Sequence, residues 1–222
     1  MTQMIRGVLF DMDGVLLDTE KLGSQILPVI IEELGYNCPE DLYFRVLGAN
    51  RQVSNQIYYG LFGNDFPGDY ADKLFFDRML EIARRGETPL KPGMEACIAG
   101  LKSRGIKIAL ATSSERSVVE TYQRHLPAMD GIFDAMVCGM EVPNGKPAPD
   151  IYRLAAEKLG LRPEECVGVE DSRNGVISLR AAGCHSVMIP DLLPFSEALA
   201  PYVDTCLGSL SDLCPLIDRL NG

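Results

Sequence analysis

Short apolar segments alternate with amphipathic segments along most of this chain. Compact apolar runs rich in β-branched residues predict strands, and apolar residues spaced three or four positions apart predict helices. Six runs predict strands: Val8–Phe10, Ile106–Ala111, Ala135–Cys138, Cys166–Val169, Ser186–Ile189 and Val203–Leu207. Because helical segments separate the later strands, the pattern predicts an α/β fold with a Rossmann-like, doubly wound parallel sheet.

One long stretch departs from this alternation. From Pro39 to about Gly86 the pattern is helical throughout, with no convincing strand. It follows a helix predicted from about Glu20 to Gly35, in which Pro28 would introduce a kink or divide the helix in two. We therefore expect a core domain formed by residues 1–18 and 88–222, with an all-helical domain of residues 19–87 inserted into it.

Composition narrows the class of protein. The chain has 222 residues, of which 46% are hydrophobic and 23% charged, as in ordinary globular proteins. No apolar run approaches the ~20 residues needed to cross a bilayer, and the N-terminus lacks a signal-like pattern. A formal charge of −10 without clustered Lys and Arg disfavours nucleic-acid binding. We expect a cytoplasmic protein without membrane contact, either a monomer or a weak homodimer.

The first predicted strand ends in two carboxylates, Asp11 and Asp13, followed by Gly14. Alternate side chains of an extended segment share a face, so both acids could point into one cleft. Two like charges at such a distance require a proton or a cation between them. A calcium loop of the EF-hand kind is disfavoured because Val15 and Leu22 occupy positions that need oxygen ligands. An ordinary Asp-Gly turn remains the alternative for this pair alone.

Polar residues also follow other predicted strands. Thr112 and Ser113 end the second strand, Lys146 lies in a loop after the third, and Glu170 with Asp171 ends the fourth. In doubly wound sheets, ligands bind outside the carboxyl ends of the strands. This ordered set is therefore much more specific than any one pair of residues.

The set resembles the four motifs of the haloacid dehalogenase superfamily, and the similarity extends across the whole core. The closest resemblance is to the branch containing β-phosphoglucomutase and small-metabolite phosphatases. It is carried by FDMDGV at 10–15, GKPAPD at 145–150 and VEDS at 169–172. The helical insertion resembles the cap domain of that branch, placed after the first motif.

The resemblance implies a role for each strand-end residue. Asp11 would be the nucleophile that forms an aspartyl phosphate, and Asp13 the general acid and base. Mg²⁺ is the implied cofactor, with Asp11, the backbone carbonyl of Asp13 and Asp171 as ligands and Glu170 bound directly or through water. Because dehalogenases and phosphonatases of the superfamily lack the second aspartate, Asp13 favours phosphoryl transfer.

The resemblance also implies a cradle for the phosphoryl group. Lys146 would supply positive charge, with the Thr112 hydroxyl and backbone N–H groups around it. The predicted phosphate-binding set is Met12, Asp13, Thr112, Ser113 and Lys146. Alternatively, Lys146 could be a solvated loop residue, Thr112 a helix cap, and Glu170 an acid on the surface or one that only supports the ligands. Asp18 and Thr19 could belong to a hinge, or Thr19 could cap the first inserted helix.

Substrate choice depends on the inserted helices. A glycine followed by Arg51 matches the spacing of a substrate-binding arginine in β-phosphoglucomutase, so Arg51 is a candidate cap residue. Two other positions depart from the mutase: Gly23 replaces a histidine, and Asp72-Lys73-Leu74 covers the region of an expected lysine. We therefore expect a phosphatase for a small phosphorylated metabolite such as a sugar phosphate. A sugar-phosphate mutase is the alternative, and a non-catalytic binding protein is disfavoured because Asp11, Asp13 and Lys146 are all present.

Overall fold

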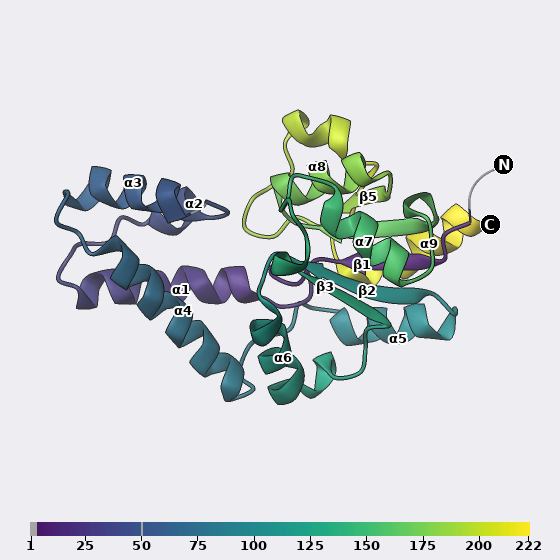
Figure 1. Cartoon of the computed structure of the whole chain (residues 1–222), viewed down its shortest axis with the longest axis horizontal. Helices are drawn as coiled ribbons and strands as arrows, with labels where there is room; N and C mark the ends of the chain where they lie inside the picture. Colours follow the sequence, from purple (N-terminus) through teal and green to yellow (C-terminus); the bar gives the residue numbers. More distant parts are fainter. Residues whose placement is uncertain (1–3, 50) are drawn as a thin grey trace.

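The fold is a parallel sheet covered by helices on both faces, with a separate group of helices at one end (Figure 1). The computed structural model describes residues 4–49 and 51–222. Within them, the sheet has six parallel strands in the order β3-β2-β1-β4-β5-β6. The strands are β1 (Gly7–Phe10), β2 (Lys107–Thr112), β3 (Ala135–Cys138), β4 (Cys166–Glu170), β5 (His185–Met188) and β6 (Thr205–Cys206). The predicted α/β fold class is confirmed.

Strand β1 lies in the middle of the sheet and is buried on both faces. Phe10, its last residue, pairs with Leu110 of β2 and Val169 of β4. A strand buried on both faces is expected to be apolar throughout, as the sequence Gly7–Phe10 is. This register brings the residues that follow β1, β2 and β4 to one edge of the sheet.

Helices cover the two faces of the sheet. The covering helices are α5 (Met94–Ser103), α6 (Arg116–His125), α7 (Asp150–Lys158), α8 (Arg173–Ala182) and α9 (Leu213–Asn221). Leu9 packs in a cluster with residues of α7 and α8, whereas Val8 and Phe10 pack on the opposite side with residues of α5, α6 and α9. This division follows from the alternation of side chains along a strand. In the described part of the chain, no helix combines the length and the apolar character needed to cross a membrane.

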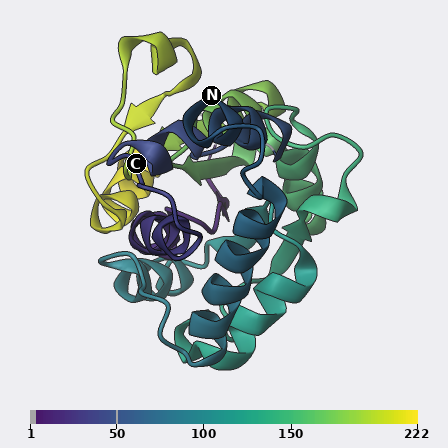
Figure 2. The same ribbon diagram turned by 90° about the vertical axis from the view of Figure 1, so that its left-hand side faces the viewer.

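The inserted helices have a hydrophobic cluster of their own, built around Leu27, Ile30, Tyr58 and Phe66. We call this group the cap; it comprises α1 (Thr19–Glu33), α2 (Leu42–Val46), α3 (Arg51–Phe62) and α4 (Gly68–Arg84). Pro28 lies inside α1 and does not divide it. Figure 2, viewed from the cap side, shows α4 running beside α6, where the two helices are in contact. The domain boundaries at residues 18/19 and 87/88 remain a prediction.

Two chain segments connect the cap to the core, and they lie side by side. Leu17 forms an antiparallel bridge with Leu90, and the Asp18 N–H donates to the carbonyl of Pro89 at 2.8 Å. Lys91 extends this pairing, because its Nζ contacts Asp18 Oδ1 at 3.3 Å and Asp191 Oδ1 at 2.7 Å. The connection is therefore tied to the core by both backbone and side-chain contacts.

Candidate active site

The backbone after β1 turns sharply beside the end of β4. The Asp11 N–H still donates to the carbonyl of Val169 at 3.0 Å, which continues the strand pairing by one residue. Gly14 then adopts φ 73°. A Cβ atom at Gly14 would lie 2.3 Å from Asp171 Oδ2, so this close approach requires glycine for steric as well as conformational reasons.

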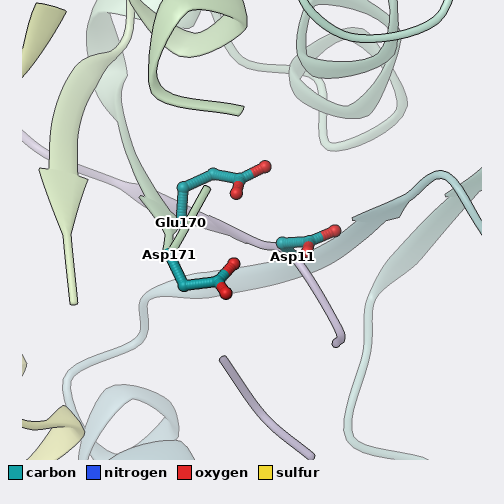
Figure 3. A group of neighbouring side chains, drawn as sticks. All are labelled: Asp11, Glu170 and Asp171. Carbon is teal, nitrogen blue, oxygen red and sulfur yellow. The ribbon is translucent and has the colours of Figure 1, made fainter. Parts of the chain in front are cut away.

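Three carboxyl groups converge at the ends of β1 and β4. Asp11, Glu170 and Asp171 each place an oxygen within 4.8 Å of the others (Figure 3). Burial, together with the charges of Glu170 and Asp13, raises the pKa of Asp11 to about 7 despite the nearby Lys146. Burial and the charge of Glu170 also raise the pKa of Asp171 well above its usual value. Clustered carboxylate oxygens of this kind fit a hard divalent cation, whose charge would offset their mutual repulsion.

Lys146 lies between two of these acids. Its Nζ contacts Asp11 Oδ1 at 2.7 Å and Glu170 Oε1 at 2.6 Å, and its side chain is only 7% exposed. Burial alone would lower the pKa of Lys146, but the two carboxylates outweigh that effect and raise it. Tyr152 adds a ring face 5.0 Å from the Lys146 ammonium. Lys146 is thus a buried cation in the site and does not extend into solvent.

Both carboxyl oxygens of Glu170 accept hydrogen bonds. Oε1 accepts hydrogen bonds from Lys146 at 2.6 Å and from Tyr152 Oη at 2.5 Å. Oε2 accepts from the Ser172 hydroxyl at 2.9 Å, and Ser172 also caps α8. Gly175 permits the first turn of α8 to press against this carboxylate, because a Cβ there would lie 1.8 Å from Glu170 Cδ. Glu170 is therefore rigidly placed and helps to position Lys146.

Asp13 is bound by two hydroxyl groups. Its Oδ1 accepts from Thr19 Oγ1 at 2.9 Å and its Oδ2 from Ser114 Oγ at 3.0 Å. Burial raises the pKa of Asp13, and these two hydrogen bonds oppose the shift. Thr19 therefore does not cap α1, whose N-cap residue is Asp18. Its position links the first turn of the cap to Asp13.

Residues at the carboxyl end of β2 complete the site. Thr112 is 1% exposed and accepts a hydrogen bond from the Ser114 N–H at 3.1 Å. It lines a cleft of ≈ 330 Å³, which we call the catalytic cleft, together with Ser113, Lys146, Asp11, Asp13 and Asp171. Glu170 lies behind this lining. The Met12 side chain is fully buried in the core, so only the backbone of Met12 is available to a ligand.

Arg51 is separate from these core residues. Its side chain is 69% exposed and forms a two-contact ion pair with Asp69, at 2.7 Å from Nε and 2.5 Å from Nη2. It lines a second hollow of ≈ 420 Å³ between α1, α2, α3 and α4, which we call the cap cavity. Arg51 is not among the residues that line the catalytic cleft.

A family model described as haloacid dehalogenase-like hydrolase matches residues 5–183. The chain belongs to this family. The Phosphorylated carbohydrates phosphatase of Thermotoga maritima is 35% identical over 82% of this chain and 84% of that protein. Hexitol phosphatase B of Escherichia coli is 28% identical over 95% of each chain. The structure of CbbY from Rhodobacter sphaeroides in complex with phosphate covers 95% of this chain and 96% of that one, with 29% identity and a TM-score of 0.73.

These relatives confirm that the chain is a haloacid dehalogenase-like phosphoric monoester hydrolase. The strand-end residues Asp11, Asp13, Thr112, Lys146 and Asp171 meet in one cleft, as family membership leads one to expect. Two buried carboxylates and a buried cation within one cleft are side chains of the kinds that phosphoryl transfer requires.

Sequence reasoning missed several residues that hold this hydrolase site together. Tyr152 has no motif to mark it and reaches Glu170 only because α7 packs against the sheet. Ser114 directly follows Thr112 and Ser113, so its place at a strand end was a usable signal. The sequence indicates only a cap or a hinge role for Thr19. Its bond to Asp13 depends on how the chain turns back after Gly14.

Proposed function

We propose that this protein is a Mg²⁺-dependent phosphatase that hydrolyses a sugar or polyol monophosphate through an aspartyl-phosphate intermediate. The observation that carries the proposal is the burial of Lys146 between Asp11 and Glu170, beside Asp171. A cation at this point offsets negative charge on both the acids and an incoming phosphoryl group. It also lowers the pKa of Asp11 against the raising effect of burial, and so favours the anionic form that a nucleophile requires.

The reaction would proceed in two steps. An oxygen of Asp11 forms a bond to phosphorus while the bond from phosphorus to the leaving oxygen breaks, and Asp13 gives its proton to that oxygen. In the second step a water molecule attacks phosphorus, Asp13 takes its proton, and the bond to Asp11 breaks to release inorganic phosphate. Lys146, Thr112 and the backbone N–H groups of residues 12–13 and 113 would hold the phosphoryl oxygens.

The acidic cluster fits a divalent cation. Asp11 and Asp171 would provide carboxylate ligands, Asp13 would provide its backbone carbonyl, and Glu170 would bind directly or through water. Oxygen-only donors are typical of Mg²⁺ sites. When bound, the ion would neutralise charge between the acids and the phosphate. Because both Glu170 oxygens already accept hydrogen bonds, we favour a bridging water for that residue.

The proposed substrate class draws on the relatives and on the cap. Two relatives are named Phosphorylated carbohydrates phosphatase and Hexitol phosphatase B. Lys73, in the region where a mutase is expected to have a cap lysine, is exposed and paired with Asp77 at 2.6 Å. Gly23 provides no side chain in place of the mutase histidine. Transfer of the phosphoryl group to water is therefore favoured over transfer to a second sugar hydroxyl.

A substrate screen tests the proposal. Phosphate release would be measured with Mg²⁺ for sugar phosphates, polyol phosphates, nucleotides, phosphoglycolate and an aryl phosphate, alongside an isomerisation assay with β-glucose 1-phosphate. We expect release from sugar or polyol monophosphates and no isomerisation. Isomerisation without release would identify a mutase, and binding without either reaction would identify a non-catalytic protein.

A further inference from the structure

One side chain, Glu20, borders three hollows at once. It lies in the first turn of α1 and lines the catalytic cleft, the cap cavity and a crevice of ≈ 220 Å³ behind Asp13. The mechanism proposed above gives Glu20 no role. A half-buried carboxylate at the junction of these spaces would contact any substrate that extends from the cleft into the cap.

A specific contact orients Glu20. The buried Tyr43 donates a hydrogen bond from Oη to Glu20 Oε2 at 2.6 Å. Burial and the charge of Glu20 raise the pKa of Tyr43, so the phenol stays protonated and remains a donor. Among residues 4–49 and 51–222, Tyr43 is the only hydrogen-bond donor to this carboxylate. The Oε1 atom is therefore available to a ligand.

Gly23 makes room for this contact. A Cβ atom at position 23 would lie 2.4 Å from Tyr43 Oη and 2.9 Å from two ring carbons. Any side chain at this position would displace the tyrosine that holds Glu20. Gly23 departs from the mutase pattern, and the Tyr43 hydroxyl occupies the space that a side chain at position 23 would need.

The cap cavity beyond Glu20 is suited to hydroxyl groups. Asp72 lines it as a second half-buried carboxylate and accepts a hydrogen bond from Tyr58 Oη at 3.1 Å. The positive charge of Arg51, at the edge of the cavity, is paired with Asp69. Burial raises the pKa of both Glu20 and Asp72. In their ionised form these carboxylates only accept hydrogen bonds, so they favour hydroxyl donors and repel a further anionic group.

The position of Asp13 indicates which part of a substrate meets Glu20. Asp13 is the proposed proton donor to the leaving oxygen, and Glu20 lines both the catalytic cleft and the crevice together with Asp13. We propose that Glu20, oriented by Tyr43 in the space left by Gly23, selects uncharged, hydroxylated leaving groups and rejects those with a second anionic group. This assignment rests on the proposed phosphatase function and deepens it.

The test compares three probes: sorbitol 6-phosphate, 2-phosphoglycolate and p-nitrophenyl phosphate. We expect the wild type to have a higher kcat/KM for sorbitol 6-phosphate than for 2-phosphoglycolate. Glu20→Gln keeps the shape of the side chain but removes its charge. It should lower the ratio of kcat/KM for sorbitol 6-phosphate to kcat/KM for 2-phosphoglycolate by about tenfold. Glu32→Gln removes an exposed charge from the same helix and should leave the preference unchanged. Turnover of p-nitrophenyl phosphate reports whether each variant has a working site.

Two further variants separate orientation from charge. Tyr43→Phe removes only the hydroxyl that holds Glu20 and should narrow the preference by roughly threefold. Gly23→Ala should act in the same direction by displacing Tyr43. If Glu20→Gln fails to fold, an unchanged preference in Tyr43→Phe still overturns the assignment.

The outcomes distinguish failure of the proposed role of Glu20 from failure of the proposed phosphatase function. Turnover of p-nitrophenyl phosphate with an unchanged preference in Glu20→Gln overturns the role of Glu20 alone. A uniform loss for all three probes overturns it as well, since that pattern indicates a general defect. If the wild type releases phosphate from none of them, the phosphatase proposal fails together with the assignment.

Discussion

The catalytic cleft and the cap cavity differ in how their polar side chains are held. In the cleft, Lys146 is buried between Asp11 and Glu170, and each contact comes from a residue at or near a strand end. The cap cavity is larger, at ≈ 420 Å³ against ≈ 330 Å³, and Arg51 at its edge is mostly exposed. The groups proposed to carry out the chemistry are thus fixed by the sheet, while the side chains that could contact the rest of a substrate lie on the cap helices.

Removing the proposed nucleophile should have the largest effect. Asp11→Asn keeps the shape of the side chain but removes the anionic oxygen that would attack phosphorus. We expect turnover of an aryl phosphate to fall by a factor on the order of 10⁴ or more. Thermal unfolding would show that the variant is folded. Turnover near the wild-type level would show that Asp11 is not the nucleophile.

Removal of divalent cations should have the next largest effect. The acids at the ends of β1 and β4 would then face the phosphate without a neutralising charge, and we expect at least a 100-fold loss of turnover. The measurement is phosphate release after treatment with a chelator, followed by addition of excess Mg²⁺. Full activity in the chelator, with metal analysis showing no bound ion, would contradict the proposed metal site.

Tyr152→Phe tests whether the cleft depends on its supporting contacts. The change removes one hydrogen bond to the fully buried Glu170 and leaves the ring beside Lys146. We expect kcat to fall by roughly tenfold and the free energy of unfolding by about 1–2 kcal/mol. Tyr202→Phe, on a side chain packed near Val176 and Leu199, is the matched control. Equal behaviour of the two variants would show that Tyr152 does not position the lysine.

Arg51→Ala should have the smallest effect, because Arg51 lies in the cap and already has Asp69 as a partner. We expect KM for a sugar monophosphate to rise about threefold, and KM for an aryl phosphate to rise less. Arg45→Ala is the control, since Arg45 is an exposed arginine of the cap paired with Asp41. The same rise for both substrates would mean that Arg51 does not contact the sugar.

The sequence predicted the fold of the core well because its signals are local. A continuous apolar run such as Val8–Phe10 has to be buried on both faces, and helices between such runs lead to parallel strands. The candidate site followed from the same logic, since Asp11, Thr112 and Glu170 lie at strand ends by their position in the chain. The all-helical pattern of the insertion was equally local, and Pro28 was accommodated within α1.

Contacts between elements could not be predicted in this way. Nothing near Tyr152 in the chain indicates that its hydroxyl reaches Glu170, and nothing near Gly23 indicates that it makes space for Tyr43. Each of these contacts depends on how two helices, or a helix and the sheet, pack together.

The order of the elements, and the edge of the sheet at which the candidate residues Asp11, Thr112 and Glu170 lie, could thus be inferred from the chain alone. How these residues are held became visible in the folded protein, where Lys146 lies between two acids and Asp13 between Thr19 and Ser114. A residue's place at a strand end follows from its position along the chain. Hydrogen bonds between distant side chains exist only after the helices have packed on the sheet.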